Sequence, residues 1–118
     1  MSSLSVVFAG SPAAAVPSLR ALAGSEHRVD TVITREDSPQ GRRGTLTETS
    51  VARAATELGI PVIRSNRLDG AATEAVTALA PDLGVIVAYG GLVREPLLST
   101  PRLGWINLHF SLLPRWRG

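Results

Sequence analysis

The sequence contains no cysteine and no lysine, and only two histidines among its 118 residues. The missing cysteines exclude disulfides and thiolate metal sites, and they fit a protein of a reducing compartment such as the cytoplasm. The two histidines, His27 and His109, cannot build a zinc site unless carboxylates join them. We therefore expect no metal. The absence of lysine fits the codon bias of a GC-rich genome better than a functional requirement.

Long hydrophobic segments are missing as well. The longest apolar stretch, near Val85 to Tyr89, is far shorter than the ~20 residues that a membrane-spanning helix needs. The amino-terminal segment lacks a basic start and contains Pro12 and Pro17 where a signal peptide would have its apolar core. The net charge of +2 is too small to argue for nucleic acid by itself. These absences predict a cytoplasmic protein without a membrane partner.

What the sequence does contain is an alternation of short apolar runs with helix-like stretches. The runs are mostly β-branched and bounded by glycine, proline or charges, which is typical of strands. The predicted strands are Leu4–Ala9, Val29–Thr34, Ile60–Ile63, Leu83–Ala88 and Trp105–His109. The predicted helices are Pro12–Ala23, Ser50–Leu58, Asp69–Leu79 and a shorter one at Arg94–Leu98. Strands that alternate with helices imply parallel crossovers, so we expect an α/β fold with a Rossmann-like open parallel sheet flanked by helices.

The junction after the first predicted strand has the chemistry of a helix start. Ser11 can cap the free amides, Pro12 suits the first helical position, and Gly10 allows a tight turn. A helix start can also hold an anion such as phosphate. However, the segment from Gly10 to Ala13 lacks the spaced glycines of a dinucleotide-binding motif. A turn with a helix cap is therefore the preferred interpretation.

The segment from Arg35 to Thr49 is predicted to be the least regular part of the chain. It is rich in glycine, proline and polar residues and carries the adjacent cations Arg42 and Arg43. Loops of this length in compact domains are often functional. A solvated connector is the simpler interpretation, and the residues alone favour it.

Polar side chains interrupt the last predicted strand. Because side chains alternate along a strand, Asn107 and His109 would face the same side, while Ile106, Leu108 and Phe110 could pack beneath. The Asn amide can donate to an oxyanion, and His can move a proton near neutral pH, so the pair suits acyl transfer. Asn-x-His is a short pattern, however, and the two residues could simply finish a strand.

A second candidate segment, Val87-Ala88-Tyr89-Gly90-Gly91, leaves the fourth predicted strand at its carboxyl end, where ligands bind in open parallel sheets. The loops after the first, fourth and fifth strands should therefore meet at one crevice. As an alternative, Tyr89 could be a half-buried aromatic followed by a glycine turn.

Three motifs carry a resemblance to a known family. The run Ser111-Leu-Leu-Pro-Arg-Trp-Arg-Gly118, the opening Val7-Phe-Ala-Gly-Ser-Pro12 and the middle Val87-Ala-Tyr-Gly90 are similar, in order and spacing, to the folate-dependent formyltransferases. They most resemble the methionyl-tRNA formyltransferase branch. This resemblance implies transfer of a formyl group from the co-substrate 10-formyltetrahydrofolate to the amine of initiator methionyl-tRNA.

The resemblance also implies roles for particular residues. Asn107 and His109 would be catalytic, and Arg42 and the less well-matched Arg43 would contact the tRNA. The implied folate-binding residues are Tyr89, Gly90, Ser111, Leu112, Leu113 and Pro114. No metal is implied.

By the same resemblance, residues 1–118 are expected to be an incomplete N-terminal catalytic domain, with the sheet truncated after its fifth strand. A third catalytic residue of the family, an Asp, and a C-terminal tRNA-binding domain have no counterpart here. The isolated chain is therefore predicted to be nearly inactive, and the complete protein is expected to be a monomer. Two alternatives stay open. One is another folate-dependent formyltransferase or hydrolase, acting on glycinamide ribonucleotide or an amino sugar nucleotide. The other is a non-catalytic folate-binding remnant.

Overall fold

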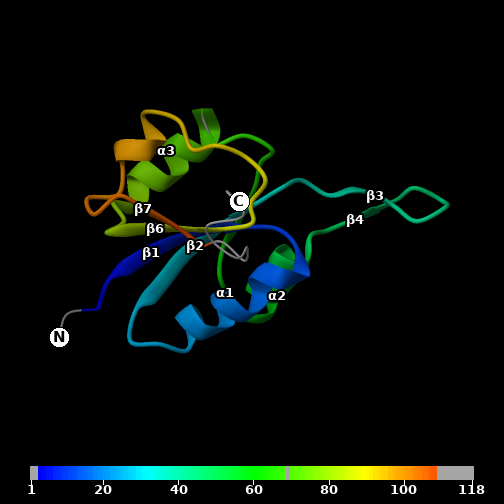
Figure 1. Cartoon of the computed structure of the whole chain (residues 1–118), viewed down its shortest axis with the longest axis horizontal. Coiled ribbons are helices and arrows are strands. Elements are labelled where there is room, and N and C mark those ends of the chain that lie inside the picture. Colours follow the sequence, from blue (N-terminus) through cyan, green and yellow to red (C-terminus); the bar gives the residue numbers. More distant parts are fainter. Residues whose placement is uncertain (1–2, 69, 109–118) are drawn as a thin grey trace, which may run out of the picture.

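A five-stranded parallel sheet forms the centre of the molecule (Figure 1). The computed structural model describes residues 3–68 and 70–108 of the chain. The strand order is β5-β2-β1-β6-β7, and each neighbouring pair is parallel. The strands are β1 (Ser5–Gly10), β2 (Arg28–Thr34), β5 (Val62–Arg64), β6 (Leu83–Val87) and β7 (Trp105–Leu108). This arrangement confirms the predicted Rossmann-like sheet and places its topological switch point between β1 and β6.

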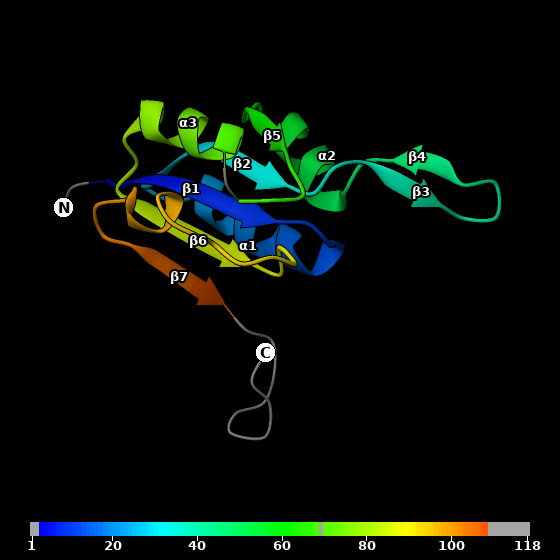
Figure 2. The ribbon, with the colours of Figure 1, turned by 90° about the horizontal axis from the view of Figure 1, so that it is seen from above.

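Helices cover both faces of the sheet (Figures 1 and 2). Helices α1 (Val16–Ala23) and α2 (Ser50–Glu57) pack on one face, and α3 (Gly70–Leu79) with the short 3-10 helix η2 (Leu97–Ser99) packs on the other. Strand β1 is buried at every residue: Phe8 points to the α1/α2 side, and its neighbours Val7 and Ala9 point to the α3 side. Burial on both faces explains its continuous apolar run.

Two predicted helices differ from the structure. The predicted helix Pro12–Ala23 is a 3-10 turn, η1 (Ala13–Ala15), followed by α1, and no side chain caps the start of η1. The predicted cap by Ser11 is therefore wrong, because the Ser11 hydroxyl bonds to other parts of the fold instead. The predicted helix Arg94–Leu98 is reduced to η2. Pro96 lies directly before it and has no amide hydrogen to donate inside a helix.

The predicted irregular loop at 35–49 is also wrong, because it contains a β-hairpin. Strand β3 (Ser38–Gln40) pairs antiparallel with β4 (Thr45–Thr47), and the amide of Gly44 donates to the carbonyl of Gly41 across the turn at 3.2 Å. Residues 38–47 project away from the body in both views (Figures 1 and 2). The arm below means residues 35–49, with 35–40 as its first leg and 45–49 as its second. Gly41 and Gly44 have φ of 71° and 61°, which L side chains rarely adopt.

Strand β7 lies at the edge of the described sheet. Ile106 and Leu108 were expected to pack beneath it, yet their side chains are 53% and 44% exposed. That expectation is wrong because β7 pairs with β6 alone in the described sheet and no helix of the described residues is packed over these two side chains. None of the helices in the described ranges has the length and apolar character that a membrane crossing requires.

Candidate functional site

The carboxyl ends of three strands lie level with one another. Gly10 at the end of β1 is in register with Val87 of β6, and Val87 is in register with Leu108 of β7. A Cβ atom on Gly10 would lie 2.7 Å from the Val87 carbonyl oxygen and 2.9 Å from the Phe8 ring, so only glycine fits this junction. The close approach of β1 and β6 therefore brings the loops that follow them together, as the sequence predicted.

A pocket of ≈ 820 Å³ opens over these strand ends. It is lined by segments that are far apart in the sequence: 11–13, 35–40, 47–50, residue 66 and 88–89. The loop after β1, both legs of the arm and the loop after β6 each contribute one wall. A pocket of this size, formed at the topological switch point, is the usual position of a ligand in this class of fold.

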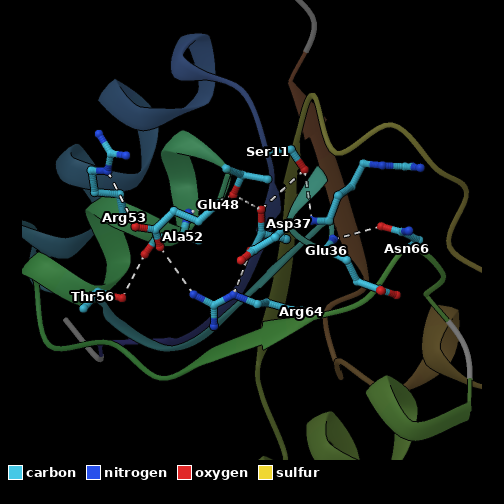
Figure 3. A network of polar contacts seen from close by, with 12 residues as sticks. Ser11, Glu36, Asp37, Glu48, Ala52, Arg53, Thr56, Arg64 and Asn66 are labelled. Atoms are coloured by element: carbon cyan, nitrogen blue, oxygen red, sulfur yellow. Dashed lines mark hydrogen bonds and ion pairs between the residues drawn. The ribbon is translucent and has the colours of Figure 1, made fainter. Parts of the chain in front are cut away.

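A chain of buried hydroxyl groups holds the pocket floor (Figure 3). The Ser11 hydroxyl donates to the Tyr89 carbonyl at 3.3 Å and accepts from the Thr34 hydroxyl at 3.4 Å. Thr34 and Thr49 hydroxyls lie 2.6 Å apart, and the Thr49 oxygen accepts from the amide of Ala52 at 3.0 Å. Since Thr34 donates to Ser11, Thr49 donates to Thr34. The hydroxyl groups therefore donate in one direction, from Thr49 through Thr34 and Ser11 to the Tyr89 carbonyl. They connect the loops after β1, β2 and β6 to the start of helix α2.

Two polar contacts attach the first leg of the arm to the rest of the pocket. A guanidinium nitrogen of Arg35 donates to the Gly90 carbonyl at 3.0 Å, and the amide of Glu36 donates to the Asn66 side-chain oxygen at 2.8 Å. The Arg35 amide also donates to the Ser11 hydroxyl at 3.2 Å. Sequence reasoning missed Arg35 and Asn66, because nothing local in the sequence distinguishes them from other exposed polar residues.

The loop after β6 is held by its aromatic residue. Tyr89 is 1% exposed, fully buried rather than half-buried, and its hydroxyl donates to the Ser65 carbonyl. Within this loop Ala88 has φ of 52° and Gly90 has φ of 93°. A left-handed conformation at an alanine is unfavourable, and such residues cluster at ligand-binding loops. The Tyr89 ring packs into the core, so Tyr89 can offer only its backbone to a ligand here.

A second pocket of ≈ 550 Å³ lies on the other side of Asn66. Its walls are the start of the β5–α3 connection and the end of the same β6 loop, with Arg67, Leu92 and Arg94 among the lining residues. Asn66 lines both pockets, so the two pockets are neighbours. The loop after β6 also contributes to both, through residues 88–89 to the larger one and through residues 91, 92 and 94 to the smaller one.

The predicted site residues are distributed unevenly over this geometry. Asn107 is exposed on β7, in register with Ile86, and lines neither of the two pockets. Arg42 and Arg43 are exposed at the turn of the arm, away from the pocket. The predicted residues His109, Ser111, Leu112, Leu113 and Pro114 lie outside the described residues, as does Phe110.

The pocket is lined by the charged side chains of Arg35, Glu36, Asp37 and Glu48, but these do not form a metal site. Among the described residues no group of three or more His, Cys, Asp or Glu side chains could hold a metal ion. The Asp82 carboxylate has a lowered pKa, because the amide of Ser5 donates to it at 2.9 Å and Arg102 donates to it at 2.9 Å. Asp82 lies just before the amino end of β6, opposite the pocket, so its role is structural.

The fold is shared with solved formyltransferases. Over 99% of this chain and 54% of the other, it resembles phosphoribosylglycinamide formyltransferase from Anaplasma phagocytophilum, with a TM-score of 0.69 and 21% sequence identity. Glycinamide ribonucleotide transformylase 1 from Symbiobacterium toebii gives a TM-score of 0.67 at 21% identity, over 98% of this chain and 56% of that one. At this identity the likeness concerns the fold alone.

Sequence comparison is more specific. The profile of the family described as formyl transferase matches residues 4–118. Proteins named methionyl-tRNA formyltransferase from Clavibacter sepedonicus and from Leifsonia xyli subsp. xyli are each 66% identical over 113 residues, which is 96% of this chain. The chain spans 37% of the length of these relatives. The chain therefore belongs to the formyl transferase family.

Proposed function

We propose that the chain is part of an enzyme that transfers a formyl group from 10-formyltetrahydrofolate to the α-amine of methionyl-initiator tRNA. The observation that carries this proposal is the 66% identity to two proteins named methionyl-tRNA formyltransferase over nearly all of the chain. The site supports it, because a pocket at the strand ends and a projecting cationic arm suit a small co-substrate and a large anionic one.

The reaction needs few groups from the protein. The amine attacks the formyl carbon, a new C–N bond forms, and the bond from that carbon to the folate nitrogen then breaks. The proton lost by the amine is the one that the leaving nitrogen requires. We infer that the Asn107 amide donates a hydrogen bond to the oxyanion of the intermediate and that His109 moves the proton. The exposed amide of Asn107, one residue before the end of β7, supports this role.

Folate binding is assigned to the loop after β6. When bound, 10-formyltetrahydrofolate supplies the formyl group. Tyr89 lines the pocket of ≈ 820 Å³, and Gly90 lies between Tyr89 and Gly91, which lines the pocket of ≈ 550 Å³; both pockets are large enough for a small molecule. The carbonyls of Tyr89 and Gly90 already accept a hydrogen bond within the protein, from Ser11 and Arg35, and a carbonyl oxygen has a second lone pair that can accept from the polar edge of a pterin. Ser111, Leu112, Leu113 and Pro114 complete this proposed set.

The tRNA is assigned to the arm. Arg42 and Arg43 occupy the exposed turn, where a guanidinium can pair with a phosphate without losing another partner. The legs of the arm line the pocket. A tRNA held by the turn could therefore present its aminoacyl end to the same pocket, which supports a nucleic-acid acceptor over a small amine.

The acceptor assignment is tested by steady-state formylation with the natural-length protein. Arg42→Ala should raise the KM for methionyl-tRNA about tenfold and reduce the slope of log KM against log salt by about 1, because one phosphate contact is lost. Arg20→Ala, an exposed arginine on α1 remote from the arm, is the matched control and should change neither. Preferred formylation of glycinamide ribonucleotide over methionyl-tRNA would show that the acceptor is wrong.

The catalytic assignment is tested on the strand itself. Asn107→Ala should lower kcat by about 10²–10³-fold with little change in either KM, as expected when an oxyanion donor is removed. Ile106→Ala, on the opposite face of the same strand, is the control and should stay within about twofold. An unchanged kcat for Asn107→Ala would remove Asn107 from the mechanism.

A further inference from the structure

The guanidinium group of Arg64 lies between the two legs of the arm (Figure 3). Arg64, the last residue of β5, donates through Nε to Asp37 at 3.3 Å and through Nη2 to Glu48 at 3.4 Å. Asp37 directly precedes β3, and Glu48 directly follows β4. Arg53 of α2 also pairs with Glu48, at 3.6 Å. A single guanidinium from the body of the protein thus joins both ends of the hairpin.

Little else fixes the direction of the arm. Its two strands pair with each other and with no strand of the main sheet. Leu46, the large apolar residue of β4, is 69% exposed and packs into neither core cluster. The backbone contacts of Arg35 and Glu36 hold only the first leg, and the Thr49 hydroxyl holds only the second. Arg64 is the described side chain that contacts both legs at once.

We propose that Arg64 is the positioning residue of the arm: it bridges Asp37 and Glu48 and so sets the direction in which the arm presents Arg42 and Arg43. The functional consequence rests on the proposed assignment of tRNA to the arm. Arg64 itself is not a catalytic residue, because it contacts the legs and lines neither pocket.

Arg64 acts as a partner shared by both legs of the arm, and neither of its two ion pairs is strong by itself. The side chains of Arg64, Asp37 and Glu48 are 41%, 42% and 32% exposed, and an ion pair at such exposure contributes little to stability. A second pair costs less conformational entropy when the guanidinium is already ordered by the first. Without Arg64, two carboxylates at the base of a narrow hairpin would repel each other. A weak contact is enough here, because the other described contacts hold one leg each and do not couple the two legs.

The direction of the arm can be measured by spin labels, since this chain has no cysteine of its own. In the natural-length protein, with any other cysteines replaced, Gln40→Cys on the arm and Ala75→Cys on the exposed side of α3 accept the two labels. The spread of label distances should at least double in Arg64→Met. Arg64→Lys, which keeps the charge but not the two-pronged geometry, should fall between.

Two further variants make the distance measurement decisive. Arg20→Met removes the Arg20–Glu57 ion pair, which measures 3.1 Å and joins α1 to α2, and should leave the spread unchanged. The double variant Asp37→Asn with Glu48→Gln removes both ion pairs of Arg64, together with the Arg53–Glu48 pair, without touching β5, and should broaden the spread at least as much as Arg64→Met does. A spread for Arg64→Met equal to that of Arg20→Met would overturn the proposal, as would an unchanged spread in the double variant.

Kinetics then test the consequence. Arg64→Met should raise the KM for methionyl-tRNA about three- to tenfold, in keeping with the loss of two exposed ion pairs. Its kcat and its KM for the folate should stay within about twofold, a split that general loss of structure would not produce. If Arg42→Ala leaves the KM for tRNA unchanged, the assignment of tRNA to the arm is wrong, while the label distances still decide the role of Arg64.

Discussion

Strand β7, which carries Asn107, is attached to the sheet through a contact that leaves no room for one methyl group. Gly84 of β6 is in register with Trp105 of β7, and the Trp105 ring lies across it. A Cβ atom at Gly84 would be 2.3 Å from two carbon atoms of the ring. Carbon atoms in ordinary contact lie about 3.5–4.0 Å apart. Gly84→Ala must therefore push the ring away by roughly 1.2 Å, the difference between 3.5 and 2.3 Å.

The ring cannot easily yield. The Trp105 Nε1 donates to the Leu97 carbonyl at 3.2 Å, and its backbone is fixed by pairing with β6. Overpacking of this kind typically costs about 1–3 kcal/mol. Replacing glycine by alanine also restricts the unfolded chain, which stabilises a protein by about 0.4–1 kcal/mol when the site is free of strain. The difference between the two effects gives the expected result: Gly84→Ala should lower the free energy of unfolding by up to about 2.6 kcal/mol.

Gly24→Ala is the matched control. Gly24 ends α1 with φ of −90°, and an added Cβ would meet nothing closer than the Arg20 carbonyl at 3.4 Å. Gly24→Ala restricts the unfolded chain in the same way but introduces no clash, so it should stabilise the chain by up to about 1 kcal/mol. Urea unfolding at constant m-value measures both changes. Combining Gly84→Ala with Trp105→Leu should remove most of its cost. Equal stability of the two alanine variants would refute the reasoning.

Four further substitutions test other parts of the fold. Thr34→Val removes a buried hydroxyl from the chain under the pocket and should lower the free energy of unfolding by about 1–3 kcal/mol in the same assay, because it leaves hydroxyl partners without their bonds. Ala80→Gly and Ala88→Gly relieve φ of 47° and 52° and should each stabilise the chain by up to about 1 kcal/mol; a loss of stability at Ala80, which is remote from the pocket, would show that no strain is stored there. Asp82→Asn should lower stability near pH 7. The pKa of Asp82 is lowered in the folded protein, so the Asp82 carboxylate stabilises the fold above its unfolded pKa of about 3.9. This stabilisation is lost as the pH falls through the folded pKa. The free energies of unfolding of the two proteins should therefore converge in acid.

The sequence predicted the sheet because its signal is local. Strand β1 was expected at Leu4–Ala9 and lies at Ser5–Gly10, and β6 was expected at Leu83–Ala88 and lies at Leu83–Val87. Both are runs of apolar residues that are buried on two faces, and such runs need no knowledge of the partner strands. The order of the strands in the sheet was not predicted, because it depends on long-range packing and not on local sequence.

The arm escaped prediction because burial does not shape its sequence. Every residue of β3 is exposed, and Pro39 within it argues against a strand. The hairpin is an isolated two-stranded ladder, so neither strand shows an apolar face. Its available signal was the turn, in which Gly41 and Gly44 bracket two arginines before the β-prone Thr45-Leu46-Thr47.

The contacts that build the site are long-range, and this is why sequence reasoning misplaced them. Ser11 looked like a helix cap, yet its partners Thr34 and Tyr89 are distant in sequence. Arg64 was not singled out by its sequence, yet it joins residues 37 and 48. A hydroxyl or a guanidinium has several possible partners, and only the folded chain selects among them.

The floor of the pocket and the arm are held by forces that respond differently to salt. Buried hydroxyl bonds under Ser11 and Thr34 are barely screened, whereas the exposed pairs of Arg64 weaken as the screening length falls to ~3 Å at 1 M salt. Folate binding at the floor should therefore change little with salt. Binding of tRNA should weaken for two reasons, loss of phosphate contacts and loosening of the arm. In Arg64→Met the ion pairs that hold the arm are already absent, so salt cannot loosen the arm further by screening them. Its KM for tRNA should therefore exceed that of the wild type at low salt and converge with it at high salt. Parallel salt curves that never converge would contradict this account, because the loss of a screened ion pair must shrink as the salt concentration rises.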